Sequence, residues 1–426
     1  MSPKRGSKRR VVLLLAALTL VVLLGLVWTS RDRIAVALMA KEIQRRVPLK
    51  EIPLPAVDAS VLDPLRQYLA DNCSSPEEYV LSKFDDHDIV FVGEHHRIKH
   101  DVELLHRLIP LLHARGVYNL GIEFANHEDQ GLIDSLIASD EYDESLANRI
   151  LFNHSVMWGY QEYADVFRAA WRLNRDLPEG IRPFRIVGLN ERTDWSHVRS
   201  EEDLRDPEVL AKVWPGGTGD EFMAQAVLRE FVEREEKALI YCGLHHAFTR
   251  FKQPKVVRSD GTVAEFFDRR MGHLVFDRIG ERATTIALHA SWPGRRSAGP
   301  LVYPVDGVID ALMKTVDPTH RKVGFDTCGT PFGLLKGETT SYGYGLEEFT
   351  LGDFCDGYVF QGPCSQFENV SLIPAFINRD NLKEAKRRCA NPKFRTGFWR
   401  FLGSDFMNEL IAVNGNVEDH FAPFEW

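Results

Sequence analysis

The sequence predicts an α/β fold with a mostly parallel central sheet, helices on both faces, and a site at the C-terminal ends of the strands. Short apolar runs alternate with segments of helical periodicity, and several of these runs end in Glu or His. The first strand–helix–strand unit spans about 40 residues, a length that suits two parallel strands joined by a helix. With 44% hydrophobic and 27% charged residues, this chain of 426 residues can bury a large core.

The N-terminus reads as a membrane anchor. Residues 1–10 are basic, and the uncharged apolar run 11–28 approaches the ~20 residues that span a bilayer. We expect residues 11–28 to form a transmembrane signal-anchor. Residues 1–10 would then lie in the cytoplasm, and the main domain would be extracytoplasmic. The alternative is a cleaved signal at Ala35-Val-Ala37, although that motif lies beyond Arg31, Asp32 and Arg33, which is late for cleavage.

Residues 29–56 are expected to form a juxtamembrane helix, at 34–46, and a stiff Pro-containing linker, at 48–55. The α/β domain then covers 57–426, with insertions near 199–220 and 250–262. A net charge of −9 argues against a nucleic-acid partner, because binding to phosphates requires clustered Lys and Arg. The sequence leaves the oligomeric state open.

The first strand, at 89–92, ends in Gly93-Glu-His-His. Apolar residues at helical spacing predict a helix at 101–114, and a second strand at 117–124 contains Glu123. The remaining elements are expected in the following order: helices at 130–137, 144–151 and 161–174, a strand at 183–191, a helix at 221–236, a strand at 238–242, a helix at 263–279, and strands at 284–288 and 357–361.

Glu and His side chains follow several of these strands, which favours a shared site, because the carboxyl ends of parallel strands meet at one sheet edge. Imidazole and carboxylate are ligands of Zn, Mn and non-haem Fe. We therefore expect Glu94, His96, Glu123 and His246 to be catalytic, with His96, Glu123 and His246 holding the metal. Hydrogen-bonded scaffolding is the alternative.

Other polar residues at the same strand ends are candidates for ligand binding. Adjacent histidines on a strand point to opposite faces, so only one of each pair should reach a common site. An arginine here suits an anionic group or a neighbouring acid. The candidates are His95, Arg97, His100, Asn190, Glu191, His245 and His289.

The six cysteines are too sparse and scattered for a disulfide scaffold. Most are expected to be buried thiols. An exported location would permit bridges, and Cys355 with Cys364 is the first pair to test.

The motifs Gly93-Glu-His-His96, Gly121-Ile-Glu123 and Gly243-Leu-His-His246 resemble the superfamily of Tiki metalloproteases, ChaN-like haem-binding proteins and erythromycin esterases. The local likeness is closest to ChaN-type sequences, which share a further His soon after the first motif, here His100. They also share a Tyr-rich helix, here beginning in 158–163, that leads to a strand ending at Asn190. The esterases carry their histidine one residue later, and no lipoprotein cysteine follows the apolar run, unlike in ChaN lipoproteins.

This resemblance covers roughly 84–248, with weaker support to 361, and implies a cleft that uses Glu94, His96, Glu123 and His246. Members divide between metal-dependent hydrolysis and haem binding. The first expectation is a membrane-anchored, extracytoplasmic, metal-dependent hydrolase of an ester or amide, with Zn, Mn or Fe undecided and a small molecule or peptide as substrate. The alternative is a haem- or iron-binding protein of ChaN type without catalysis, and a catalytically silent scaffold is a third reading.

Overall fold

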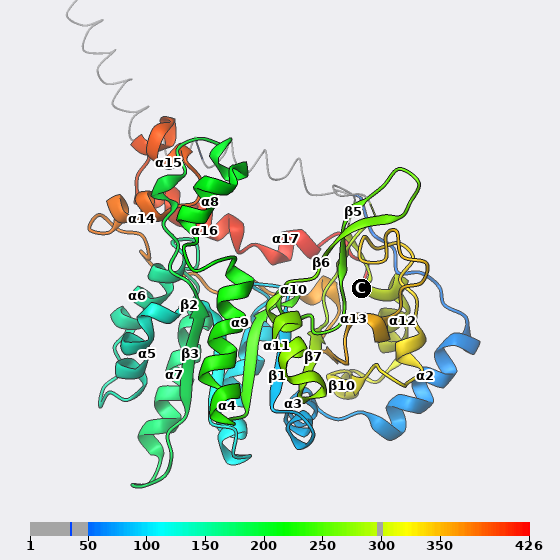
Figure 1. Cartoon of the computed structure of the whole chain (residues 1–426). Helices are drawn as coiled ribbons and strands as arrows, with labels where there is room; N and C mark the ends of the chain where they lie inside the picture. Colours follow the sequence, from blue (N-terminus) through cyan, green and yellow to red (C-terminus); the bar gives the residue numbers. More distant parts are fainter. Residues whose placement is uncertain (1–34, 36–49, 296–300) are drawn as a thin grey trace, which may run out of the picture.

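The computed structural model of the chain describes residues 35, 50–295 and 301–426. Its centre is a seven-stranded sheet in the order β10-β11-β7-β1-β4-β2-β3 (Figure 1). The strands are β1 (Ile89–Glu94), β2 (Asn119–Asn126), β3 (Arg185–Asn190), β4 (Ala238–Gly243), β7 (Ala283–Leu288), β10 (Val323–Asp326) and β11 (Gly357–Phe360). The neighbouring pairs are parallel except for β10 with β11. The expected mostly parallel sheet is confirmed.

Strand β1 occupies the middle of the sheet and is buried on both faces. Ile89 and Phe91 pack into one hydrophobic core, whereas Val90 and Val92 pack into another. Continuous apolar strands of this kind form where helices cover both faces of a parallel sheet. This burial explains why the run before Glu94 lacks polar residues.

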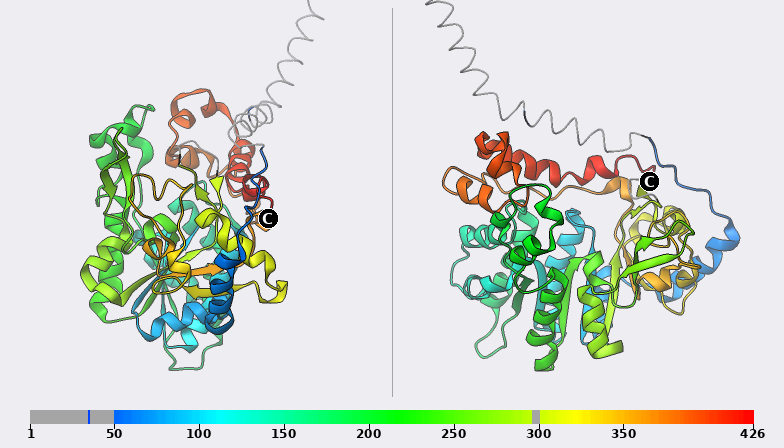
Figure 2. Two further views of the ribbon diagram at one scale, coloured as in Figure 1. Left: turned by 90° about the vertical axis from the view of Figure 1, so that its right-hand side faces the viewer. Right: turned by 45° about the horizontal axis from the view of Figure 1, so that its top comes forward.

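Helices cover both faces of the sheet (Figure 2). One face carries α3 (Pro76–Ser82), α4 (Lys99–Ala114), α5 (Gln130–Ile137), α6 (Glu144–His154) and α7 (Gln161–Asp176). The opposite face carries α9 (Gly219–Glu230) and α11 (Met271–Ile279). A third core, near β10 and β11, contains residues of α2 (Ala59–Asn72), α12 (Val308–Thr315) and α13 (Leu351–Phe354).

The C-terminal part of the chain lies over the carboxyl ends of the strands (Figure 1). It contains α14 (Leu382–Arg388), α15 (Lys393–Thr396), α16 (Ser404–Asn414) and α17 (Val417–Phe421). The Tyr160 hydroxyl donates to the carbonyl of Ile411 at 2.9 Å, which fastens α16 to the start of α7. These helices therefore roof the sheet edge on which the sequence predicts a site.

The predicted helix at 263–279 is wrong over its first half. Residues Gln253–Val257 and Val263–Phe267 form an antiparallel hairpin, β5 and β6, and α11 starts only at Met271. The turn contains Asp260 and Gly261, and Gly261 adopts a φ of +88°. Asp-Gly is a strong hairpin signal because glycine adopts positive φ without steric cost.

The insertion expected near 199–220 contains α8 (Pro207–Val213), and α9 begins at Gly219. Strand β10 and the short pair β8 (Trp292–Pro293) and β9 (Leu301–Val302) were not anticipated. All six cysteines are free thiols, so the Cys355–Cys364 bridge is not formed.

The predicted membrane anchor at 11–28 and the helix at 34–46 fall almost wholly outside the described residues. Within the part of the chain that the structure describes, no helix has both the length and the apolar character needed to cross a membrane.

Candidate functional site

Glu123 on β2 lies between two histidines from other segments. Its Oε2 accepts a hydrogen bond from the backbone N–H of Gly243 at 2.6 Å. Its Oε1 lies 3.4 Å from Nε2 of His246 and 3.9 Å from Nε2 of His96. His246 is on the short helix α10 (Leu244–Ala247), which directly follows β4, and His96 follows β1. Three strand ends thus supply one cluster.

His96 is oriented by Glu94, the last residue of β1. Nδ1 of His96 lies 2.7 Å from Oε1 of Glu94. The carboxylate of Glu94 is buried and also accepts hydrogen bonds from the hydroxyls of Tyr163 and Tyr241, at 2.8 and 2.6 Å. Both oxygens of Glu94 are therefore engaged. Burial acts to lower the pKa of His96, but the carboxylates of Glu123 and Glu94 outweigh it and raise that pKa.

His246 has an equivalent carboxylate behind it. Nδ1 of His246 lies 2.6 Å from Oδ1 of Asp220 in the first turn of α9. Asp220 also accepts hydrogen bonds from Arg270 and from the backbone N–H of Met271. Burial opposes a charge on His246, yet Glu123 and Asp220 raise its pKa to about 9. The same contacts lower the pKa of Asp220 despite its burial.

The donor types of this cluster fit a divalent metal. His96 and His246 each use Nδ1 for a carboxylate and direct Nε2 toward Glu123. Metal-binding histidines nearly always carry such a partner on the second nitrogen, because it fixes the tautomer and the ring orientation. Two imidazoles with one carboxylate form a common ligand set. Their ligand atoms do not all lie within 4.8 Å of one another, so binding one ion requires a side-chain adjustment.

A cavity of about 1390 Å³ adjoins the cluster and includes His96 in its wall. Further wall residues come from β3 and the segment after it, from the end of α6, and from the C-terminal helices. The cavity is rich in imidazole and indole, contributed by His95, His96, His154, His420, Trp158, Trp195, Trp214 and Trp399. Ligand pockets are typically about 300–1,000 Å³, so this cavity can accept a large ligand.

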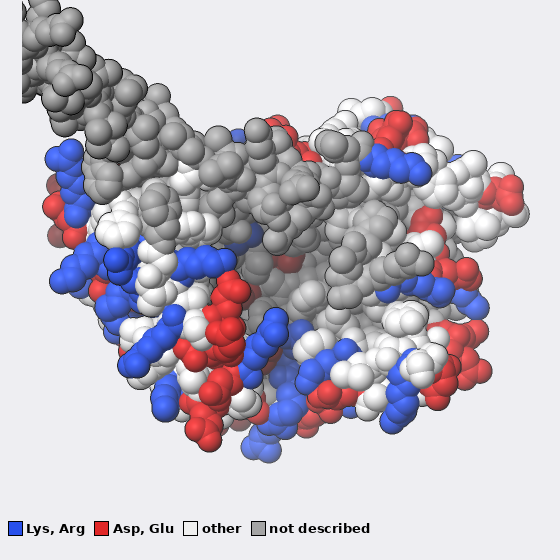
Figure 3. Space-filling model, turned by 90° about the horizontal axis from the view of Figure 1, so that it is seen from above, with Lys and Arg blue, Asp and Glu red and all other residues white. Residues whose placement is uncertain are grey.

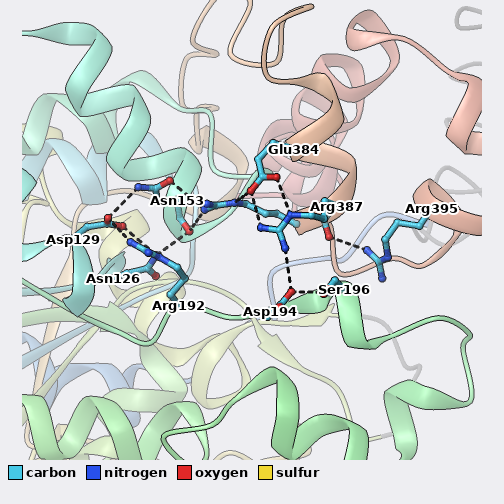
Figure 4. Close-up of polar contacts among 10 residues, drawn as sticks. Asn126, Asp129, Asn153, Arg192, Asp194, Ser196, Glu384, Arg387 and Arg395 are labelled. Atoms are coloured by element: carbon cyan, nitrogen blue, oxygen red, sulfur yellow. Dashed lines mark hydrogen bonds and ion pairs between the residues drawn. The ribbon is translucent and has the colours of Figure 1, made fainter.

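A polar network holds the cavity walls together (Figure 4). Arg387 on α14 pairs with Glu384 at 2.7 Å and with Asp194 at 3.3 Å, which joins the C-terminal helices to the segment after β3. Arg192 pairs with the buried Asp129 at 2.6 Å. The roof is thus attached to the sheet by charged side chains, most of them exposed to solvent.

His95 and Arg97 line the cavity but do not contact Glu123. His95 stacks on His420 with ring centroids 6.1 Å apart, and its buried Nδ1 has no hydrogen-bond partner among the described residues. Loss of hydration, reinforced by His420, lowers the pKa of His95 to about 3. Arg97 adopts a φ of +75°, and its guanidinium lies 4.9 Å from the ring centre of Trp158.

Asn190 and Glu191 lie beside the cluster. The side-chain amide of Asn190 donates to the backbone carbonyl of Glu123 at 3.3 Å. Glu191 is buried and accepts from the backbone N–H of Gly216 at 2.6 Å. Both residues hold backbone segments around the cavity.

Three other candidates are not brought to the cluster. His245 is exposed and bonds to the hydroxyl of Tyr342 at 2.8 Å. His100 packs against Phe367 and lies 3.4 Å from Asp101. His289, at the end of β7, lies in a separate buried group with Asp310 and Cys364.

Asp220, Tyr163 and Tyr241 were not identified from the sequence. Asp220 lies in the stretch expected to be a surface insertion, although Thr218-x-x-Glu221 forms a capping box that marks a helix start at this point. Tyr163 lies in an amphipathic helix and Tyr241 in an apolar strand, and neither pattern indicates that the hydroxyl bonds to a buried carboxylate.

These features define an α/β protein with a His–carboxylate cluster at the carboxyl edge of a parallel sheet, open to a large cavity. Residues 80–203 match the family described as "Haem-binding uptake, Tiki superfamily, ChaN". This match confirms the resemblance over that segment. A comparison with curated proteins found no match.

Several solved structures are similar at low identity. A Bacillus cereus protein is 11% identical, covers 72% of this chain and 97% of its own, and gives a TM-score of 0.42. A succinoglycan biosynthesis protein is 10% identical, with 71% and 97% coverage and a TM-score of 0.46. ChaN of Campylobacter jejuni, described as binding haem cofacially, is 14% identical, with 53% and 91% coverage and a TM-score of 0.32. Similarity at this level says nothing about ligand or activity here.

Proposed function

We propose that the protein is a metal-dependent hydrolase of an ester or amide, with the metal held by His96, Glu123 and His246. The observation that carries this proposal is the paired arrangement of the histidines. Each has a carboxylate on Nδ1, and each directs Nε2 toward the same carboxylate oxygen of Glu123. Zn, Mn and Fe all suit this donor set.

A bound divalent metal would lower the pKa of a coordinated water to about 7 and polarise a substrate carbonyl. Other groups of the protein hold the proposed metal ligands in position for this chemistry. Glu94 and Asp220 hold the two imidazole rings in place, and the Gly243 N–H fixes one oxygen of Glu123. Because both oxygens of Glu94 are already engaged, we assign it a positioning role.

The cavity would bind the substrate beside His96. The indole of Trp158 packs edge-on against the His96 ring, with centroids 5.1 Å apart. Arg97 and Arg388 in the cavity wall could pair with an anionic group of a small-molecule or peptide substrate. On the face drawn in Figure 3, the visible charged side chains are of both signs and interspersed.

We further propose that the protein is anchored by residues 11–28, with the main domain extracytoplasmic, on the basis of the basic and apolar N-terminal sequence. Protease accessibility of the main domain in intact and permeabilised membrane preparations tests this orientation. Digestion restricted to the cytoplasmic side would overturn it.

Hydrolysis of chromogenic esters and amides by the full chain, loaded in turn with Zn²⁺, Mn²⁺ and Fe²⁺, tests the enzymatic proposal. We expect metal-dependent turnover that Glu123→Gln and His246→Gln abolish. His320→Gln provides a matched control, because His320 is largely exposed and distant in the fold. Metal binding that is unaffected by Glu123→Gln and His246→Gln would overturn the ligand assignment.

Haem binding is the second candidate, favoured by the imidazole- and indole-rich cavity and the family description of residues 80–203. His95 fits an axial-ligand role, because its buried Nδ1 is unpartnered among the described residues and its low pKa keeps the ring neutral. Haem addition should then give a Soret band that His95→Ala weakens and His320→Ala does not. Haem uptake with no metal bound at Glu123 would favour this function over hydrolysis.

A further inference from the structure

A second group of potential ligands lies away from the cluster around Glu123. Nε2 of His289 is 3.2 Å from Oδ1 of Asp310 and 3.8 Å from Sγ of Cys364. The ligand atoms of all three residues lie within 4.8 Å of one another. All three side chains are buried. His289 follows β7, Asp310 is on α12, and Cys364 opens a short 3₁₀ helix.

The carboxylate of Asp310 is poorly stabilised in the metal-free fold. Its side chain is 0% exposed, and neither carboxylate oxygen has a hydrogen-bond partner among the described residues. His289 Nε2 lies 3.2 Å from Oδ1 but makes no well-directed hydrogen bond to it, and a buried carboxylate in this state is costly, because burial removes the hydration that stabilises its charge. The Oγ of Ser291, two residues after His289, is also buried and unpartnered within the described chain.

The group does not have the arrangement of a cysteine nucleophile. Asp310 and Cys364 both approach Nε2 of His289, and Nδ1 is already bonded to the hydroxyl of Tyr358 at 2.8 Å. A catalytic triad instead places the orienting acid and the nucleophile on different ring nitrogens. Burial, reinforced by Asp310, raises the pKa of the Cys364 thiol well above its ordinary range. The group is also absent from the wall of the large cavity.

We propose that His289, Asp310 and Cys364 form a second, structural metal site that takes Zn²⁺. Tetrahedral zinc with N, O and S ligands separates its donor atoms by about 3.3–3.8 Å, close to the 3.2 and 3.8 Å separations present. Nδ1 of His289 is hydrogen-bonded to the hydroxyl of Tyr358, and this contact would hold the other ring nitrogen, Nε2, toward the ion. Zinc displaces the Cys364 proton to solvent, and the thiolate and carboxylate then balance its charge.

Such a site would join elements that are distant in the sequence. The backbone N–H of His289 donates to the carbonyl of Val359 on β11, next to β7 in the sheet. Ser365, beside Cys364, donates its backbone N–H to the carbonyl of the terminal residue, Trp426. Zinc would therefore tie helix α12 and the C-terminal end of the chain to the sheet edge, without participating in hydrolysis.

The test uses the full chain carrying Glu123→Gln and His246→Gln, so that the first cluster cannot hold metal. Any metal that this variant retains then reports on the second site alone, whether or not the proposed function is correct. Protein produced in cobalt-supplemented medium should retain one cobalt per chain, with a near-ultraviolet thiolate-to-cobalt charge-transfer band. Cys364→Ser in this background should remove the band. Cys355→Ser is the matched control, since Cys355 is an equally buried thiol outside the group.

A second variant covers the case in which Cys364→Ser does not fold. Asp310→Asn has nearly the same shape but removes the charge, so it should reduce cobalt retention at least tenfold and remove the rise in melting temperature caused by Zn²⁺. Protein that retains no cobalt, or a charge-transfer band unchanged in both variants, would overturn the proposal. Loss of the band in Cys355→Ser alone would assign the thiolate elsewhere and overturn it equally.

Discussion

His246 and Asp220 are joined by a contact of 2.6 Å between Nδ1 and Oδ1, although 25 residues separate them in the chain. The pair lies opposite the contact between His96 and Glu94, and Glu123 lies between the two imidazoles. This arrangement makes Asp220 a positioning residue for one proposed metal ligand. Its consequences for metal affinity, stability and pH response can each be measured.

Asp220→Asn should weaken Zn²⁺ binding at the first cluster by about 10–100-fold, the usual effect of removing a carboxylate behind a metal-bound histidine. Isothermal titration of the full chain measures this affinity. Asp260→Asn is the control, because Asp260 lies in the exposed turn between β5 and β6. Unchanged affinity in Asp220→Asn would show that the contact does not orient His246.

Gly243→Ala should disturb His96 directly. A Cβ at Gly243 would lie 2.8 Å from Nε2 of His96 and 3.4 Å from Oε2 of Glu123. We expect a folded protein with metal affinity reduced at least tenfold, because van der Waals overlap moves the His96 ring. Gly131→Ala is the matched control, since its Cβ meets nothing within 4 Å and it lies inside α5. Full metal affinity in Gly243→Ala would contradict the proposed position of the ion.

Tyr241→Phe should destabilise the fold by about 1–3 kcal/mol, because it removes a hydrogen bond to the buried carboxylate of Glu94. Urea unfolding followed by circular dichroism measures the free energy of unfolding. Tyr142→Phe is a milder control, since the Tyr142 hydroxyl bonds to a neutral backbone carbonyl, that of Ala164. Equal effects of the two variants would show that the hydrogen bond to Glu94 stabilises the fold no more than one to a backbone carbonyl.

The metal-free protein should lose stability as pH rises from about 6.5 to about 9. The folded pKa of His246, about 9, exceeds its ordinary value of 6.5, so folding favours the protonated ring. That contribution is complete below pH 6.5 and disappears through pH 9. Its upper limit is roughly 3.5 kcal/mol, at about 1.4 kcal/mol per pKa unit.

Chelator-treated wild-type and His246→Gln proteins, unfolded across this pH range, isolate the contribution of His246. The wild type should show the decline and the variant should show a much smaller one. Parallel pH profiles for the two proteins would assign the decline to other groups.

The strand-end pattern predicted the principal cluster because it depends only on local signals. In three of the apolar runs a glycine, Gly93, Gly121 or Gly243, precedes a Glu or His by one or two residues, and parallel strands carry these residues to one edge. The position of His289 could not be predicted in the same way. β7 pairs with β1 on the side away from β4. Strand order depends on the tertiary structure and cannot be inferred from a short sequence motif.

Other errors arose where local patterns have two meanings. Residues 263–267 are apolar enough for either a helix or a strand, and the pairing of β6 with β5 decides between them. In the sequence, Asp310 and Asp220 have no motif that distinguishes them from other acidic residues. Their roles follow from the histidines that the fold places beside them.

Anomalous diffraction at the zinc edge, from crystals of the zinc-loaded full chain, tests the central claim most directly. The account predicts a peak bonded to Nε2 of His96, Nε2 of His246 and a carboxylate oxygen of Glu123, at about 2.0–2.2 Å from each. A zinc-loaded crystal with no peak at Glu123, or with haem filling the cavity and the three side chains unliganded, would contradict it.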